Sequence, residues 1–448
     1  MTSWLHPVRL GILGAAALTL AGPALAGGLD NDARSQIQEL KQELRGLKAQ
    51  NGNAWLTEQR AAEVRGVVQD VLADADTRVS LQDSGATAGW NSGFFFKSSD
   101  GAFSLKIGGQ VQVRWTLNNA KDQPATWGFS NRRTKLGFSG TVVDPSWSYK
   151  IKGAFGSGGT FAWEDAYVAK KLHNGMSVKV GAFKAPWLRE ELVSSSVQLA
   201  ADRSLVNAYF TQGYSKGIQL SYASDSWRTS LWYGNGLNSV ALGYGDGDES
   251  DWNNNATRWS IAGRLEYLVS GSWKQFKDFS SPRGEACGVM LGLGHMAQKF
   301  KPAVGETYGA GSGVNQTGIT VDVTADFGGA SLFGAVVWNA NDVDGTTTNP
   351  WGAVLQGGYF VSEDVELFGR FAYTNFDADG PMANGQIYKG LTIGMNYFLS
   401  GSKVKLTVDW SMNLDSFGSF TKSSLGWRTD TGGETDQWAL RGQLQLLF

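Results

Sequence analysis

Residues 103–117 read FSLKIGGQVQVRWTL and alternate between two kinds of side chain. In a β-strand, successive side chains point to opposite faces of the sheet. One face of this stretch would carry the apolar residues Leu105, Ile107, Val111, Val113, Trp115 and Leu117. The other would carry Lys106, Gln110, Gln112, Arg114 and Thr116. The stretch therefore predicts a strand with one apolar face and one polar, partly charged face.

The same alternation returns along the rest of the chain, in residues 147–155, 259–267, 319–327, 403–410 and 438–448. About sixteen such strands follow residue 103, with room for alternating short and long connections. Tryptophan and tyrosine recur at the predicted strand ends, as the interfacial girdles of membrane barrels require. The last predicted strand ends on Phe448. We therefore expect an all-β membrane protein in which residues 94–448 form a transmembrane β-barrel of about sixteen antiparallel strands around a water-filled lumen.

Composition excludes several other classes of protein. The 448 residues include 59 Gly, 18 Trp and only 9 Pro, which suits a large β structure and not a disordered chain. A formal charge of -2 excludes a basic nucleic-acid binder. One cysteine, Cys287, excludes an internal disulfide framework and a multi-cysteine metal site. We expect no cofactor, no bound metal and no nucleic-acid partner.

The first 26 residues have the pattern of an export signal. Arg9 precedes an apolar run over 10–21, and the stretch ends in Ala-Leu-Ala at 24–26. This is the pattern of a secretory signal peptide that is cleaved after Ala26. Export and the barrel pattern together predict a bacterial outer membrane and contact with its lipids.

Residues 27–93 differ from the predicted barrel in the spacing of their apolar residues. Ile37, Leu40, Leu44 and Leu47 are spaced three and four apart, which predicts a short coiled-coil-like helix within residues 30–80. One reading is a stalk that trimerises or touches the cell wall, and the other is a helix that packs on the rest of the protein. The stretch from Asp83 to Gly93 is rich in small and polar residues and predicts a linker.

Charge is unevenly distributed over the predicted barrel. Residues 97–228 contain 17 basic and 9 acidic side chains, whereas residues 229–448 contain 14 basic and 22 acidic ones. Lysine and arginine on a pore wall favour anions. The predicted pore-lining and anion-binding residues are Arg114, Arg132, Arg133, Lys135, Lys150, Lys152, Lys179 and Lys184.

One long stretch, from Lys184 to Asn207, does not alternate, and several blocks around it resemble one family. The blocks are Arg-Arg-x-Lys-Leu-Gly-Phe-Ser-Gly at 132–140, Glu-Asp-Ala-Tyr at 164–167, Gly-x-Phe-Lys-x-Pro at 181–186, Arg-Glu-Glu-Leu at 189–192 with Ser-Ser-Ser at 194–196, and Arg-Ser-Leu-Val-Asn at 203–207. Together they resemble the phosphate-selective porins O and P of outer membranes.

The resemblance implies a sixteen-stranded homotrimeric porin whose third extracellular loop folds into the pore. Residues 186–211 would be that constriction loop, with Arg189, Glu190, Glu191 and Arg203 at the narrow part. The expected function is passive diffusion of small hydrophilic solutes, anions such as phosphate among them, and not catalysis.

Three alternatives remain open. The chain could be a general, non-selective porin for polar solutes that also ties the outer membrane to the cell wall through its N-terminal helices. It could be a barrel enzyme, for which His173 and His295 are the histidines left after the signal. The acidic stretch with Asp246, Asp248, Glu249 and Asp251 could hold calcium, although a solvated acidic loop is favoured.

Overall fold

The computed structural model describes residues 38–43, 45–46, 66, 86–91, 93–156, 160–237, 257–300, 315–343, 345–377, 387–415, 425–428 and 436–448. The chain divides into two compact units, residues 1–84 and residues 85–448. The described residues of the first unit at 38–43 and 45–46 are helical, and the rest of the predicted coiled coil lies outside the described residues. The acidic stretch at 246–251 also lies outside them. None of the helices that are described has the length and apolar character needed to cross a membrane.

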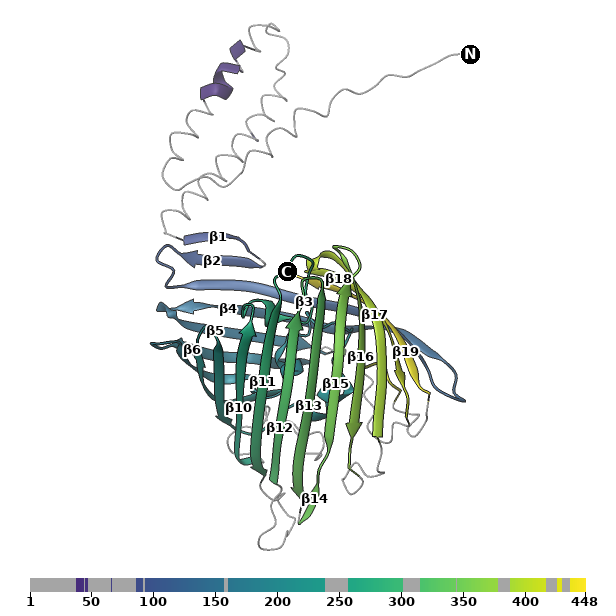
Figure 1. Ribbon diagram of the computed structural model, residues 1–448. Helices are drawn as coiled ribbons and strands as arrows, with labels where there is room; N and C mark the ends of the chain where they lie inside the picture. Colours follow the sequence, from purple (N-terminus) through teal and green to yellow (C-terminus); the bar gives the residue numbers. More distant parts are fainter. Residues whose placement is uncertain are drawn as a thin grey trace, which may run out of the picture. The chain divides into compact units, whose positions relative to one another are not determined.

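The second unit is a closed β-barrel (Figure 1). Nineteen described strands join into one sheet, of which β1, β2 and β14 are short additions, and the other sixteen form the wall. Strands β3 and β19 close the ring, with Asn119 opposite Trp438 at one end of the seam and Gln110 opposite Leu447 at the other. Every paired neighbour is antiparallel, as the sequence predicts. Closure gives each wall strand a partner on both sides, which is what a sheet in lipid requires.

The strand bounds are β1 Ala86–Trp90, β2 Phe94–Ser98, β3 Ser104–Asn119, β4 Thr126–Val142, β5 Asp144–Phe155, β6 Phe161–Lys171, β7 Met176–Lys184, β8 Tyr214–Ala223, β9 Trp227–Gly234, β10 Thr257–Ser270, β11 Gly288–Phe300, β12 Asn315–Asp326, β13 Ala330–Val343, β14 Thr346–Thr348, β15 Trp351–Phe360, β16 Val365–Asn375, β17 Ile387–Ser402, β18 Val404–Asn413 and β19 Trp438–Leu447.

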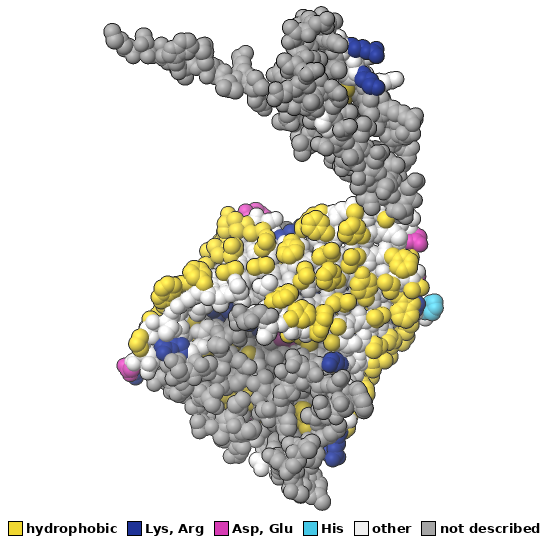
Figure 2. Space-filling model, turned by 180° about the vertical axis from the view of Figure 1, so that it is seen from behind, with side chains coloured by type: hydrophobic (Ala, Val, Ile, Leu, Met, Phe, Trp, Pro, Cys, Tyr) yellow, Lys and Arg dark blue, Asp and Glu magenta, His cyan; other side chains and the backbone are white. Residues whose placement is uncertain are grey.

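The predicted alternation separates the two faces of the wall. Val113 is 38% exposed and points outward, while its neighbour Arg114 is 2% exposed and points into the lumen. Figure 2 shows apolar side chains spread over the outer wall on one side of the barrel. An apolar outer face matches the hydrocarbon of a bilayer, and polar residues are kept for the interior.

The predicted linker is partly wrong. Residues 86–90 form β1, which pairs with β2, and β2 in turn pairs with the first residues of β3. Trp90 packs edge to face on Phe94, with 4.7 Å between the ring centroids. Cross-strand aromatic pairs of this kind stabilise a hairpin, so the barrel unit begins earlier than its alternation indicates.

The longest described connection lies between β7 and β8 and folds into the lumen. We call residues 185–213 the inward loop; it contains α3 (Arg189–Leu192) and α4 (Leu205–Phe210). Ser204 caps α4, because its hydroxyl accepts a hydrogen bond from the Asn207 amide at 3.0 Å. Trp187 is 1% exposed, and its indole N–H donates to the Phe210 carbonyl at 3.2 Å. The loop thus has an apolar core, which it shares with apolar side chains of the wall such as Met296 and Val337.

A second connection, residues 271–287 between β10 and β11, enters the barrel from the opposite end and contains η2 (Gln275–Lys277). We call it the turn-end segment. Phe279 packs against Phe333 with 4.7 Å between the ring centroids and the rings tilted by 44°, and Ser280 donates to Glu366 at 3.0 Å. The Arg189 guanidinium of the inward loop donates to the carbonyl of Phe276. The two connections therefore meet within the lumen.

Candidate functional site

One carboxylate of the inward loop, that of Asp202, binds three arginines of the wall. Asp202 accepts hydrogen bonds from Arg114 at 2.8 Å, from Arg132 at 2.7 Å and from Arg133 at 2.7 Å. Arg114 comes from β3 and the other two from β4. Burial alone would raise the pKa of Asp202, but the three guanidinium groups outweigh it and hold that pKa well below its usual range. Asp202 is therefore a charged anchor for the loop.

Two glutamates of α3 organise the loop itself. Glu190 accepts hydrogen bonds from the amide and the hydroxyl of Ser204, both at 2.6 Å. Glu191 lies 3.0 Å from the ammonium of Lys184 and 3.5 Å from Arg203. Burial would raise the pKa of Glu191, but the charges of Arg203 and Lys184 lower it to about 2. Both carboxylates shape the loop, and Glu191 stays ionised at neutral pH.

Acidic residues of the second half of the barrel are paired with arginines of the same wall. Asp322 receives two hydrogen bonds from Arg264, both at 2.8 Å, and Asp409 receives one from Arg441 at 2.6 Å. All four side chains are less than 4% exposed. These four charges cancel in pairs, whereas the excess of acidic over basic residues in residues 229–448 remains.

The open space of the lumen lies between the inward loop and strands β4–β8. A cavity of about 360 Å³ is lined there by seven cationic side chains and three carboxylates. The cations are Arg133, Lys135, Lys150, Lys152, Lys179, Lys184 and Arg203, and the carboxylates are Glu164, Asp165 and Glu191. Gly181 on β7 permits the close approach of β6 and β7 beside the cavity, since a Cβ there would lie 2.2 Å from the Ala166 carbonyl. We call this space the lysine cavity.

Carboxylates bridge most of these cations. Glu164 pairs with Lys135 and, at 2.8 Å, with Lys152, and it also accepts a hydrogen bond from the Tyr214 hydroxyl at 3.1 Å. Asp165 lies 2.7 Å from Lys150 and 3.6 Å from Lys152. These bridges hold the ammonium groups against the wall and weaken their field without abolishing the positive excess.

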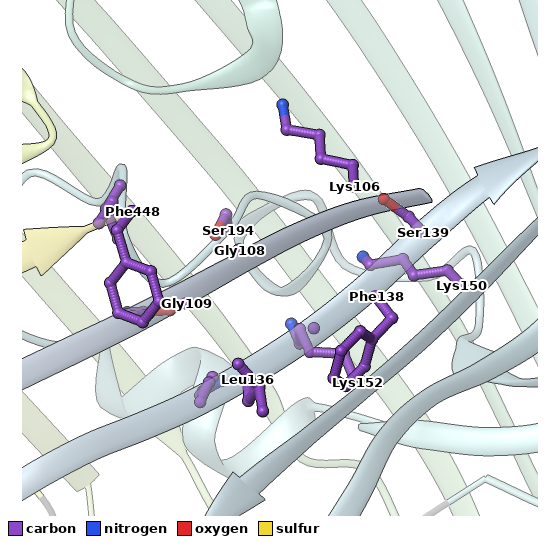
Figure 3. A pocket seen from close by; sticks show the side chains of 14 residues that line it. Lys106, Gly108, Gly109, Leu136, Phe138, Ser139, Lys150, Lys152, Ser194 and Phe448 are labelled. Carbon is purple, nitrogen blue, oxygen red and sulfur yellow. The ribbon is translucent and has the colours of Figure 1, made fainter. Parts of the chain in front are cut away.

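Two more cavities follow the lysine cavity along the wall. One of about 290 Å³ shares Lys135, Lys150, Lys152 and Ser194 with it, and Figure 3 shows Lys106, Lys150 and Lys152 around that space. The next, of about 630 Å³, shares Lys106, Ser139 and Lys150 with the second. Lysines therefore line a series of spaces on one side of the barrel, from the inward loop toward the β1–β2 hairpin.

The structure places the predicted residues in two groups. Arg133, Lys135, Lys150, Lys152, Lys179, Lys184, Glu191 and Arg203 line the lysine cavity. Arg114, Arg132, Arg189 and Glu190 lie under or within the inward loop and hold it in place. Their part in anion binding remains a prediction.

Sequence reasoning gave no role to Glu164, Asp165, Asp202 or Tyr214, which partner the predicted cations. Glu164 and Asp165 are adjacent in the Glu-Asp-Ala-Tyr block at 164–167, and that acidic pair was the available signal. His173 lies in the turn between β6 and β7, and His295 is exposed on β11. Neither histidine lines the three cavities described above. In the described ranges, no group of three or more His, Cys, Asp or Glu side chains is arranged to hold a metal ion.

Comparison with known proteins gives one family and several solved structures of similar fold. The family model described as phosphate-selective porin O and P matches residues 105–416. An anion-selective porin from Comamonas acidovorans has 14% identity and a TM-score of 0.53 over 77% of this chain and 99% of its own. The channel DcaP of Acinetobacter baumannii has 11% identity and a TM-score of 0.50 over 78% of this chain and 99% of its own. No curated protein matches the sequence.

Proposed function

Because the chain belongs to the family of phosphate-selective porins O and P, and so forms an outer-membrane channel, we propose that it conducts small anions by passive diffusion. Short connections of such barrels face the periplasm and long ones the outside. The inward loop is then extracellular in origin, and the turn-end segment is periplasmic. Solutes pass between the inward loop and strands β4–β8.

One observation carries the anion preference: the lysine cavity has seven cations against three carboxylates. A fixed positive field in a narrow polar passage raises the local concentration of anions. Asp202 is not among the residues that line the cavity, but it neutralises part of this charge by pairing with Arg133. A positive excess remains on the solute's path, in agreement with the uneven charge of the sequence.

The test is the reversal potential of the purified protein in a planar bilayer under a potassium chloride gradient. At about 0.1 M salt we expect the sign of the reversal potential to show a preference for anions. At about 1 M salt we expect the reversal potential to be smaller in magnitude. The Debye length falls from about 10 Å to about 3 Å over that range, so the wall charges act over a shorter distance. A cation-selective reversal potential at low salt would refute the proposal.

We further propose that the mature protein begins after Ala26 and assembles as a homotrimer in outer-membrane lipids. The support is the Ala-Leu-Ala pattern at 24–26 and the apolar outer wall. Intact mass spectrometry of the purified protein in detergent would give both the first residue and the number of chains. A mass that retains residues 1–26, or a single chain, would contradict it. Contact of residues 27–93 with the cell wall stays a prediction.

A further inference from the structure

We propose that a permeating anion binds at Lys179, and that this site takes singly charged, weakly hydrated anions in preference to phosphate. The inference rests on the proposed function and adds to it a residue and a class of solute. It follows from the partners of the seven cations in the lysine cavity and from the aromatic rings around one of them.

Six of the seven cations already have a carboxylate partner. The pairs are Arg133 with Asp202 at 2.7 Å, Lys135 with Glu164, Lys152 with Glu164 at 2.8 Å, Lys150 with Asp165 at 2.7 Å, Lys184 with Glu191 at 3.0 Å and Arg203 with Glu191 at 3.5 Å. An anion that binds any of these six must compete with a carboxylate that is held in place by the fold.

Lys179 differs from the other six. Among the described residues it forms no ion pair within 4.0 Å, although Asp165 and Lys150 act on it electrostatically. Asp165 is itself paired with Lys150. Lys179 is thus the cation of this cavity whose charge is least cancelled by a direct contact.

Aromatic rings hold Lys179 in its position. Its ammonium lies 4.5 Å from the ring centroid of Phe183 and 5.1 Å from that of Tyr167. The two rings meet edge to face with 5.9 Å between their centroids. Cation–π contacts of this kind position an ammonium group and replace part of its hydration, while its positive charge remains. Lys179 therefore presents an oriented, only partly hydrated charge to the cavity.

These surroundings favour one class of anion. Phosphate is strongly hydrated and needs several charged donors to replace its water. Lys179 offers one ammonium, and the negative faces of Phe183 and Tyr167 disfavour a second negative charge beside it. Glu164 and Asp165 add like-charge repulsion, which acts twice as strongly on a dianion. A singly charged, weakly hydrated anion such as nitrate loses the least hydration free energy on entering the site.

The experiment compares three variants of the full chain in planar bilayers. Nitrate conductance of the wild type should saturate with concentration, because a binding site fills. Lys179→Gln should raise the half-saturating nitrate concentration about tenfold or more, whereas Lys179→Arg should keep it within about threefold. Lys135→Gln is the matched control, since it removes an equal charge from the same cavity at a lysine whose partner, Glu164, stays paired with Lys152. It should shift the reversal potential but leave half-saturation within about threefold.

Phosphate provides the second measurement. Inorganic phosphate at about 10 mM, about ten times the concentration that would half-fill a millimolar site, should leave the chloride current of the wild type unchanged. Block of that current, or equal effects of Lys179→Gln and Lys135→Gln on half-saturation, would overturn the inference while leaving an anion channel in place. A cation-selective wild type would instead overturn the proposed function. Heat-modifiable migration on gels checks that each variant has folded.

Discussion

The guanidinium of Arg133 on β4 donates to Oδ1 of Asp202 in the inward loop at 2.7 Å. This bond joins the wall of the barrel to the element that narrows it. Arg114 and Arg132 bind the same carboxylate, so one acidic residue of the loop forms ion pairs with three arginines of the wall. The position of the loop and the charge of the lumen are therefore coupled.

Replacing Asp202 with asparagine should loosen the loop and expose those three charges. Loss of one partner from a buried ion pair costs about 3–5 kcal/mol. We expect a lower unfolding temperature and a reversal potential shifted further toward anions. The control is Asp225→Asn, which removes an equal charge from an exposed turn between β8 and β9. Equal behaviour of the two variants would contradict the anchoring role.

Replacing Arg133 and Lys135 together with glutamine should move the reversal potential toward cations. Both side chains line the lysine cavity, and lumen-facing changes tune selectivity without altering the lipid-facing wall. The charge-balanced control is Lys135→Gln with Glu164→Gln, which removes both ion pairs of Glu164 and leaves the net charge unchanged. Its reversal potential should stay near that of the wild type. An unchanged reversal potential in the variant that lacks Arg133 and Lys135 would mean that other residues produce the positive field of the lumen.

Replacing Asp278 with asparagine should stabilise the barrel at alkaline pH. Burial, with the nearby charge of Glu285, raises the pKa of Asp278 from 3.8 to about 6. The folded state therefore favours the protonated acid, and ionisation destabilises it as the pH rises from about 4 through about 6. The full cost above that range is up to about 3 kcal/mol, at about 1.4 kcal/mol for each pKa unit.

Heat unfolding measured at pH 4 and pH 8 tests this prediction. The asparagine side chain carries no charge, so Asp278→Asn should unfold at a higher temperature than the wild type at pH 8. The two proteins should differ little at pH 4, where Asp278 of the folded wild type is protonated. An advantage of equal size at both pH values would show that ionisation is not its cause.

Replacing Trp187 with alanine should destabilise the inward loop. The ring is 1% exposed, and truncation of a buried tryptophan costs about 3–5 kcal/mol. Single-channel conductance should rise and become noisier, because the loop then samples positions away from its apolar core. Trp127→Ala is the control, since that ring is 70% exposed. A quiet channel of wild-type conductance in Trp187→Ala would contradict this account.

Alternation alone predicts the strands and the faces they present. Adjacent residues such as Val113 and Arg114 fall on opposite faces, as their period of two requires. Alternation does not predict which face a side chain lies on where the pairing register between two strands shifts. A shift between Gln112 and Val113 in the β3–β4 pairing lets Arg132 and Arg133, neighbours in sequence, reach the same carboxylate.

Partners across the lumen could not be predicted from spacing. Arg133 and Asp202 are 69 positions apart and meet only because the loop turns inward. That inward turn was implied by resemblance to a family and not by the residues of the loop themselves. The turn-end segment was missed altogether, although Phe276 and Phe279 are apolar residues in a stretch without alternation.

The closing seam of the barrel has a consequence for the order of folding. Asn118 and Gln437, which hydrogen-bond across β3 and β19 at 2.9 Å, are 319 positions apart. The ring therefore cannot close before almost the whole barrel has been synthesised, and such distant pairing is intrinsically slow. We expect the inward loop to shorten this search, because Arg114 on β3 and Arg370 on β16 both donate to backbone carbonyls at residues 201 and 202. Removing the loop should thus slow refolding into detergent micelles as well as widen the passage, since early and late strands would lose their shared template.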